Sequence, residues 1–360
     1  MKLTSYRSLG RSGLIVSPLA LGTMTFGNNT WGTSNDEASA IFNTYREQGG
    51  NFIDTADIYS QGASEEIVGR LIKQTGSRDE LVLATKYGFN TAASPLEINN
   101  GVNRANPNAG GSGAKNIYRA LDASLQRLQT DYIDLYWMHV WDGVTPIEEI
   151  LHTLGNLVAA GKIRYFAFSD MPAYVAMKAA TLASERGIPA PIAMQLEYSL
   201  VAREVEREHF PVAADTGMGI MPWSPLAGGF LTGKYEQNTE QKKGRLSKPN
   251  PFGNSKFTDK NWKILSVLKQ VSTQLDRPVA QTALAWTLTK PEVTSTLVGA
   301  TSVKQMASNI ASLDVEFSVD QLKLLNEVSG LTPEFSDLMG SSGIRNMVFG
   351  GFDVKGWKEN

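Results

Sequence analysis

The amino-acid sequence predicts an α/β protein built as a (β/α)8 barrel, a TIM barrel, with an N-terminal β-hairpin and long loops at the mouth. One observation is that apolar runs typical of buried strands alternate with helical segments about eight times. A second is that polar residues of catalytic types stand at the ends of three successive apolar strands. Barrel enzymes carry their chemistry at the carboxyl ends of strands.

Length and composition limit the alternatives. The 360 residues suit one barrel domain, and the net charge of -2 gives no basic footprint for nucleic acid. The chain has no cysteine, so we expect neither disulfides nor a thiolate metal site, and no metal is predicted. No apolar run is long enough to span a membrane, and the first residues do not resemble a signal peptide. We therefore expect a cytoplasmic protein, and a homo-oligomer is compatible with the sequence.

The first half begins with a hairpin at residues 7–16, turning at residues 10–13. Ser34 and Glu37 form a capping-box pattern that predicts a helix start. Ala38, Ile41, Phe42 and Tyr45 would form its buried face, and Gly49 would end it. The other expected elements are strands at residues 18–23, 51–54 and 81–85 and helices at residues 64–74 and 114–128.

The second half repeats the alternation. Capping-box patterns at residues 145–148, 302–305 and 318–321 predict three helix starts. The other expected elements are strands at residues 132–138, 163–168, 192–196, 219–222 and 294–298, and helices at residues 172–186, 203–215, 259–275 and 278–289. Two polar segments, residues 90–113 and 227–258, are too long for ordinary connections and are interpreted as mouth insertions, and a tail follows from about residue 331.

A doubly wound nucleotide-binding fold is the main rival. It requires the pattern G-x-G-x-x-G between the first strand and helix, and nothing there matches. Neither a phosphate-binding P-loop nor the zinc motif H-E-x-x-H occurs.

Four residues form the candidate catalytic group. Asp54 ends one strand and Tyr59 follows five residues later, Lys86 ends the next strand, and His139 ends the third. Each alone could be structural, but their joint position at strand ends is a much stronger indication. The remaining histidines, His152 and His209, fall in helical segments and are interpreted as structural or solvated.

These residue types fit a proton donor for an oxygen atom. A free tyrosine has a pKa of about 10 and is a poor acid at neutral pH. A Lys86 ammonium group would stabilise the phenolate of Tyr59 and lower its pKa, while Asp54 would keep Lys86 charged. His139 would hydrogen-bond the substrate oxygen. The group therefore predicts carbonyl reduction, with hydride supplied by a cofactor.

The ordered motifs resemble the aldo-keto reductase superfamily over residues 6–313. They resemble most the bacterial branch related to potassium-channel β-subunits. The matching motifs are LGTMTFG at residues 21–27, FIDTADIY at 52–59, ATK at 84–86, His139 with Asp142, FSD at 168–170, QLEY at 195–198, WSPL at 223–226, LTGKY at 231–235 and residues 299–309.

The resemblance implies a catalytic tetrad of Asp54, Tyr59, Lys86 and His139, with Tyr59 as the acid. It also implies NADPH, with NAD as a second option, lying across the barrel mouth. The implied cofactor contacts are Gly22, Thr23, Met24, Ser169, Asp170, Gln195, Trp223, Ser224, Pro225, Leu226, Gly228, Lys234, Arg245, Gly299, Thr301, Gln305 and Asn309.

Two departures from the family pattern concern cofactor contacts. Asp170 stands where the family usually has asparagine, so this side chain can accept but not donate. Ser308 stands where an acid that binds adenine is common. No strong basic pair marks a 2′-phosphate site, so the sequence favours NADPH over NADH without requiring it.

The substrate is expected to be a small apolar or aromatic carbonyl compound. Phe26, Trp31, Tyr87, Phe89 and Trp141 are the residues expected to face it. Residues 90–113 would govern substrate range, and the lysine-rich residues 227–258 would fold over the cofactor phosphates.

Two other functions stay open at this point. One is a cofactor-binding regulatory subunit with little turnover. The other is a Schiff-base aldolase that uses Lys86, although a nearby Asp54 would hold that amine in the protonated state, which cannot attack a carbonyl.

Overall fold

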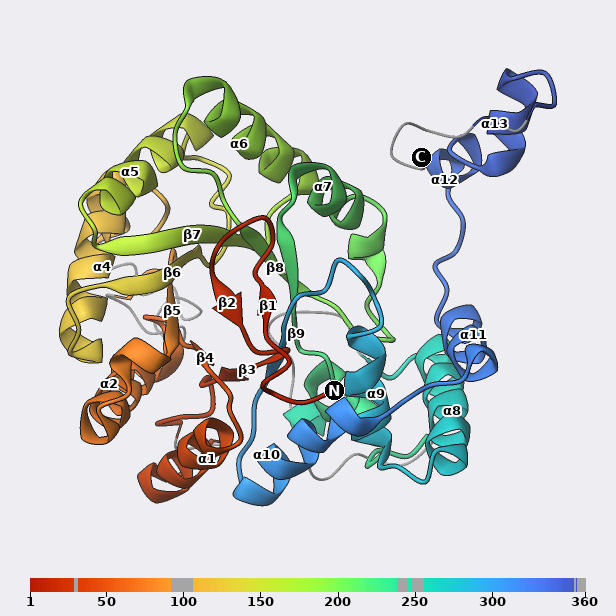
Figure 1. Ribbon diagram of the computed structural model, residues 1–360, viewed down its shortest axis with the longest axis horizontal. Helices are drawn as coiled ribbons and strands as arrows, with labels where there is room; N and C mark the ends of the chain where they lie inside the picture. Colours follow the sequence, from red (N-terminus) through yellow and green to blue (C-terminus); the bar gives the residue numbers. More distant parts are fainter. Residues whose placement is uncertain (29–31, 92–105, 238–244, 248–255, 353, 355–360) are drawn as a thin grey trace.

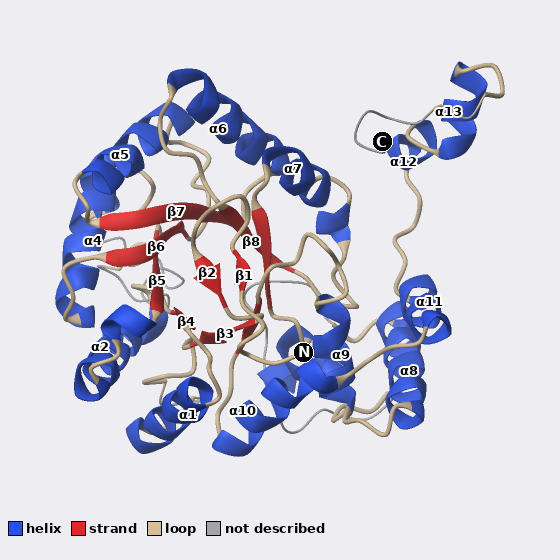
Figure 2. Ribbon diagram, viewed as in Figure 1, coloured by secondary structure: helices blue, strands red, loops and turns tan. Residues whose placement is uncertain are grey.

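The computed structural model describes residues 1–28, 32–91, 106–237, 245–247, 256–352 and 354. Its main sheet has eight parallel strands in the order β10-β3-β4-β5-β6-β7-β8-β9 (Figure 2). Ile220 of β9 is hydrogen-bonded to the segment just before β10. Its N–H donates to Glu292 O and its carbonyl accepts from Thr294 N, both at 2.9 Å. The predicted barrel is therefore confirmed. The strands are β3 (Leu19–Gly22), β4 (Phe52–Asp54), β5 (Val82–Tyr87), β6 (Ile133–Met138), β7 (Ile163–Ser169), β8 (Ala193–Glu197), β9 (Gly219–Trp223) and β10 (Thr296–Val298).

Helices surround the strands on the outside of the barrel (Figure 1). The helices are α1 (Asn35–Glu47), α2 (Ala63–Thr75), α4 (Ala114–Leu128), α5 (Ile147–Ala159), α6 (Ala173–Arg186), α7 (His209–Thr216), α8 (Asp259–Gln274), α9 (Val279–Thr287), α10 (Val303–Ile310), α11 (Val319–Val328), α12 (Phe335–Met339) and α13 (Ser342–Val348). None of the helices in the described ranges is both long enough and apolar enough to cross a bilayer.

The predicted hairpin closes one end of the barrel. Its strands are β1 (Arg7–Ser8) and β2 (Ile15–Val16), and Arg11 N donates to Gly217 O at 2.6 Å. Gly10 has a φ of +59°, and a Cβ there would lie 2.3 Å from Ile192 O, so only glycine fits. Since Ile192 and Gly217 precede β8 and β9, the hairpin covers the amino ends of the strands and leaves the carboxyl ends as the mouth.

The buried apolar residues form two clusters. The inner cluster joins the hairpin to inward-facing strand residues such as Phe52, Leu135 and Trp137. The larger outer cluster lies between the strands and the helices. Because side chains alternate along a strand, each strand contributes to both clusters.

Three predicted helix starts, at Ser34, Ser302 and Ser318, are confirmed. The Ser34 side chain accepts from Glu37 N at 3.2 Å, and the Glu37 carboxylate accepts from Val303 N at 2.8 Å, which ties α1 to α10. Ser318 and Gln321 form the full reciprocal capping box. At α10, Ser302 caps Gln305 N as predicted, but the Gln305 side chain accepts from Thr301 instead.

Two other local predictions are wrong. Pro146, not Thr145, is the N-cap of α5, because the Thr145 hydroxyl donates to Asp142 at 2.7 Å. The helix predicted at residues 203–215 begins only at His209. Arg203 is instead held by Glu206 and by Asn326 O, at 2.8 and 3.0 Å, and a short 3-10 turn at Glu204–Glu206 replaces the first part of that helix.

Most of the residue 90–113 insertion and much of the residue 227–258 insertion lie outside the described residues. The C-terminal tail is described as far as α13, which stands away from the barrel (Figure 1).

An acidic pair is buried beside the β4–β5 edge. Glu65 is fully buried and accepts from Thr85 Oγ1 at 2.5 Å and from Arg127 Nε at 2.6 Å. The Asp57 carboxylate is also buried, with no hydrogen-bond partner among the described residues. Burial, and then Glu65, raise the pKa of Asp57 to about 8, against the opposing charges of Arg127 and Arg119. Asp57 is therefore protonated in the folded protein at neutral pH.

Replacing Asp57 with asparagine should stabilise the protein at neutral pH. The folded-state pKa lies above the unfolded value, so folding takes up a proton and wild-type stability falls as pH rises from about 4 to about 8. Asp57→Asn removes that cost, which reaches at most about 4 kcal/mol at pH 7. Urea unfolding of both proteins should give a difference that grows from pH 4 to pH 8. The exposed Asp122→Asn on α4 serves as control, and a gain for Asp57→Asn that did not change with pH would contradict the assignment.

Candidate active site

The barrel mouth brings the predicted catalytic residues together. Asp54 is the last residue of β4, Lys86 is near the end of β5, and His139 directly follows β6. Because these strands are parallel neighbours, their carboxyl ends meet on one rim. Asp54 and Lys86 are completely buried, whereas Tyr59 and His139 are half-buried.

Lys86 is the centre of the hydrogen-bond network. Its ammonium group donates to Asp54 Oδ2 in a buried ion pair, to Thr55 O at 3.0 Å and to Tyr59 Oη at 3.4 Å. The three ammonium hydrogens thus have three acceptors. The second Asp54 oxygen accepts from Gln195 Nε2 at 3.2 Å, which links β8 to the same network.

The charges in this network set the protonation of Lys86. Burial alone would lower the pKa of Lys86, but Asp54 and Tyr59 outweigh burial, and the pKa is raised. Lys86 is therefore an ammonium ion at all physiological pH values, as the sequence predicted.

The pKa of Tyr59 differs from the expectation in its net direction. Lys86 acts to lower this pKa as predicted, but burial is the larger effect, and Asp54 adds to it, so the pKa is raised. Tyr59 therefore keeps its proton in the resting site. Lys86 stays within reach to stabilise the phenolate when that proton leaves.

His139 contacts Tyr59 through its ring. The two ring centroids are 5.7 Å apart in an edge-to-face arrangement, and Phe89 packs on His139 at 4.9 Å. Burial, and then Lys86, hold the pKa of His139 well below its usual range. A neutral imidazole can donate one hydrogen bond to an oxygen placed between Tyr59 and His139.

Trp223 and Asp170 form one wall of the mouth. Trp223 ends β9, and its Nε1 donates to Asp170 Oδ1 at 2.9 Å. Asp170 follows Ser169 of β7 and has a φ of +45°. Asp170 is exposed at the mouth, but desolvation by its surroundings, and then Glu197, raise its pKa to about 6, while Trp223 acts in the opposite direction. Gln195, predicted to contact the cofactor, is buried and directs its amide toward Asp54.

A glycine turn follows β9, and the Lys234 ammonium lies beside it. Beyond Ser224, Pro225 and Leu226, Gly228 and Gly229 have φ values of +65° and +94°. The Lys234 ammonium lies 3.0 Å from where a Cβ on Gly229 would be. Desolvation lowers the pKa of Arg245, and Tyr59 and Tyr235 act against that effect. The Lys234 ammonium beside this glycine turn supplies a positive charge that fits the phosphates of a dinucleotide.

The adenosine-end residues form a second cluster. Gln305 Oε1 accepts from Thr301 N at 2.8 Å, and Asn309 Nδ2 donates to Gly299 O at 3.1 Å. Gly22 ends β3 and Met24 is half-buried nearby, whereas Thr23 is buried, with its hydroxyl 3.2 Å from Asp54 O. These clusters and the glycine turn border one mouth, so the residues present fit an extended nucleotide.

Two of the predicted substrate-facing aromatics lie elsewhere. Phe26 and Tyr87 are fully buried in the outer cluster, where the Tyr87 ring packs on Tyr136 at 4.9 Å. Since Lys86 points into the barrel, the next residue along β5 must point outward. Phe89 and the half-buried Trp141 remain at the mouth, and Trp31 lies outside the described residues.

Sequence reasoning missed one member of the network. The Thr55 carbonyl accepts from Lys86, but a backbone acceptor has no side-chain signal in a sequence. Gln195 was predicted as a site residue, but its hydrogen bond to Asp54 was not. The two residues are 141 positions apart in the sequence, and only the folded chain brings them together.

Comparison with known proteins agrees with this geometry. Norsolorinic acid reductase B of Aspergillus parasiticus is 34% identical over 99% of this chain and 93% of its own length. The aryl-alcohol dehydrogenase [NADP(+)] of Phanerodontia chrysosporium is 31% identical over 95% of this chain and 90% of its own. A probable voltage-gated potassium channel subunit beta of Oryza sativa subsp. japonica is 34% identical over 86% of this chain and 91% of its own length.

The model of the aldo/keto reductase family matches residues 18–329, which include every strand of the barrel and all four residues of the catalytic group. The chain therefore belongs to the aldo/keto reductase family.

Proposed function

We propose that this protein reduces aldehydes or ketones to alcohols with NADPH, and that Tyr59 is the proton donor. The observation that carries the proposal is the buried network in which Lys86 binds both Asp54 and the Tyr59 phenol. The cofactor would supply hydride to the carbonyl carbon. The residues of this chain would manage the proton and the charge on oxygen.

The proton would move from Tyr59 Oη to the carbonyl oxygen. As negative charge develops on the phenolate, the Lys86 ammonium 3.4 Å away would stabilise it. His139, held neutral, would orient the carbonyl oxygen with a hydrogen bond. Because Asp54 and Lys86 are already paired, this stabilisation requires little reorganisation.

The cofactor would lie along the mouth. Trp223, Ser169 and Asp170 would contact the nicotinamide end, Lys234 and Arg245 the phosphates, and the Gly299–Asn309 cluster the adenosine end. The name of the Phanerodontia relative, an NADP(+) enzyme, supports NADPH over NADH. A cytoplasmic location stays a prediction.

Aromatic carbonyl compounds are the proposed substrates. Phe89 and Trp141 offer apolar surface beside His139 and Tyr174, with ring separations of 4.9 and 6.2 Å. The Phanerodontia relative is named for aryl alcohols, which supports an aromatic substrate.

Two alternatives are less well supported. A Schiff-base lysine must be neutral to attack, whereas Asp54 and Tyr59 raise the pKa of Lys86. A regulatory subunit with little turnover is suggested by the channel-subunit relatives, but such a role would not require Lys86, Tyr59 and His139 to stay together.

The decisive experiment is a panel of aliphatic and aromatic aldehydes and ketones, each assayed with NADPH and with NADH. Consumption of NADPH that is fastest with aryl aldehydes would support the proposal. Tight NADPH binding without turnover on the whole panel would favour the regulatory subunit.

Tyr59→Phe should lower kcat by roughly 10²–10⁴-fold, since it removes the proton donor and little else. Cofactor affinity, measured by quenching of tryptophan fluorescence, should stay close to that of the wild type. If the variant kept more than about a tenth of the wild-type turnover, another group would have to be the acid.

Lys86→Met should lose turnover to a similar degree, because the phenolate loses its stabilising charge. It should also destabilise the protein by about 3–5 kcal/mol, because Asp54 is left as an unpaired buried charge. The double variant with Asp54→Asn should regain much of that stability but no turnover. Borohydride trapping of a carbonyl substrate on wild-type Lys86 would instead revive the aldolase alternative.

Asp170→Asn should change the preference between the two redox forms of the cofactor. The nicotinamide ring is positively charged only when oxidised, so the Asp170 carboxylate should favour NADP⁺. We expect the ratio of the NADP⁺ to NADPH dissociation constants to rise about 3- to 10-fold in the variant at pH 8. Calorimetry should show this difference shrinking below pH 6, where Asp170 takes up a proton. An unchanged ratio at both pH values would place the ring away from Asp170.

A further inference from the structure

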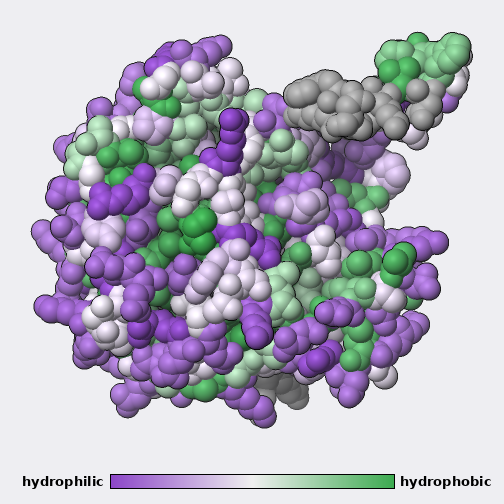
Figure 3. Space-filling view, in the orientation of Figure 1, coloured by the Kyte–Doolittle hydropathy of each residue, from purple (hydrophilic) through white to green (hydrophobic). Residues whose placement is uncertain are grey.

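The C-terminal segment at residues 334–352, here called the arm, stands away from the barrel with its apolar side chains in solvent. It holds α12 and α13 at the upper right of Figure 1. Phe335, Met347 and Phe352 are 75%, 75% and 76% exposed. The space-filling view shows hydrophobic residues at the tip of the arm, at the upper right (Figure 3). Leu338, Met339, Val348 and Phe349 are also exposed.

Such an arm is unstable alone. Its helices span only 5 and 7 residues, and helices of this length are not stable in water without tertiary packing. None of its described residues is buried. A cluster of exposed apolar side chains on marginal helices indicates a surface that is covered by a partner.

Arg207 holds the base of the arm so that the arm points away from the barrel. Arg207 donates to Thr332 O at 2.5 Å and pairs with the carboxylates of Glu334 at 3.6 Å and Asp337 at 3.3 Å. The Arg207 side chain is itself only 16% exposed. Since Glu334 and Asp337 also form the capping box of α12, the first turn of the arm cannot swing back without breaking these bonds.

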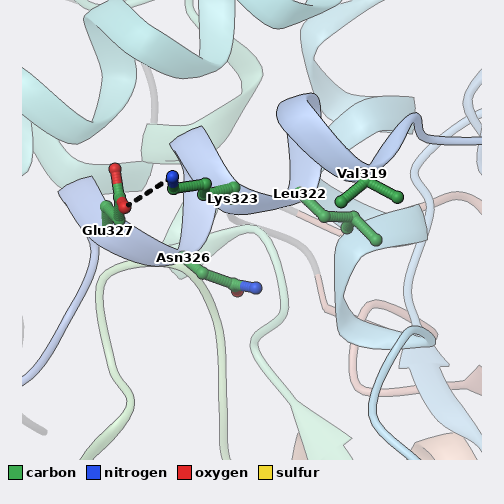
Figure 4. Close-up of a pocket in the computed structure, with 5 residues that line it drawn as sticks. All are labelled: Val319, Leu322, Lys323, Asn326 and Glu327. Atoms are coloured by element: carbon green, nitrogen blue, oxygen red, sulfur yellow. Dashed lines mark ion pairs between the residues drawn. The ribbon is translucent and has the colours of Figure 1, made fainter.

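A receiving surface lies on the helix just before the arm. One face of α11 borders a shallow hollow of about 580 Å³ lined by Val319, Leu322, Lys323, Asn326 and Glu327 (Figure 4). We call this hollow the α11 groove. Val319 is 83% exposed, although it is apolar. Lys323 and Glu327 form an ion pair at 3.9 Å on its rim, so the groove has an apolar end and a polar end.

We propose that the arm of one copy of this chain docks in the α11 groove of a second copy, and that the second arm docks reciprocally in the first. The arm follows α11 in the chain and rises on the same side of the molecule (Figure 1). One two-fold axis can therefore satisfy both arms and both grooves at once, and such isologous pairs are the commonest assemblies.

The apolar surface available is sufficient for a specific dimer. Phe335, Phe349 and Phe352 are 75%, 45% and 76% exposed, so covering them in two arms removes roughly 800 Å² of arm surface from water, to which the covered surface of the two grooves is added. That area reaches the lower range of specific interfaces. The occupant of the groove is thus a second copy, not the copy's own arm, whose base Arg207 holds outward.

Crosslinking can test which chain supplies the arm, because the protein has no cysteine of its own. Met347→Cys marks the arm and Val319→Cys marks the groove, and both positions are exposed. When the two single variants are mixed and mildly oxidised, we expect a covalent dimer joining one of each. Met347→Cys mixed with Glu66→Cys, on α2 at the opposite side of the barrel, should give none.

The double variant Met347→Cys/Val319→Cys supplies the opposite outcome. If it forms a disulfide within one chain while the mixed single variants form no dimer, the arm closes on its own copy and the proposal is overturned. If neither sample crosslinks, the arm does not reach the groove and the proposal is also overturned.

Molecular mass in solution gives an independent measurement. The wild-type chain should sediment as a dimer at micromolar concentration, and Met347→Asp/Phe352→Asp should sediment as a monomer with the same melting temperature. Val144→Asp, which changes an 85% exposed apolar residue elsewhere, should remain dimeric. A monomeric wild-type protein would refute the proposal, and none of these results depends on catalytic activity.

Discussion

The ion pair between Lys86 and Asp54 is the interaction on which the mouth of this barrel depends. Both groups are completely buried, and a buried charge is tolerated only when it is paired and its remaining hydrogen-bonding positions are filled. Three strands meet that demand: β5 supplies the ammonium, β4 the carboxylate and β8 the Gln195 amide. A shift in the register of β4 would break both contacts at once, so the fold and this polar group are specified together.

The two-layer core explains why this charge can be held in place. Strand alternation sends Lys86 inward and Tyr87 outward, so one side of β5 carries chemistry while the other packs against helices. Below the ion pair, the inner cluster and the hairpin fill the barrel and exclude water from the closed end. The site is therefore open on one side only, where Tyr59, His139 and Trp223 stand. Low polarity beneath them strengthens each charge interaction at the rim.

The sequence was informative where a signal lies within one element. Strand ends identified Asp54, Lys86 and His139, and Ser318 identified a helix start, because each depends on neighbours along the chain. Prediction from the sequence failed where one side chain has two possible hydrogen-bond partners nearby. Thr145 could cap α5 or bind Asp142, and only the folded loop decides for Asp142. The sequence also predicted a lowered pKa for Tyr59, whereas the pKa is raised. Burial depends on the assembled barrel mouth, and its effect exceeds that of Lys86.

The loop from Asp54 to Tyr59 shows how one short segment places two buried acids in different surroundings. Thr55 N donates to Ala84 O at 3.0 Å and Asp57 N donates to Lys86 O at 3.2 Å, so the loop is bonded along β5 and the Tyr59 phenol reaches Lys86. Asp54 faces that ammonium, which acts against the rise in the pKa of Asp54 that burial causes. Asp57, three residues on, faces Glu65 and keeps its proton. The two aspartates thus differ in the charge that faces them, an ammonium for Asp54 and a second carboxylate for Asp57.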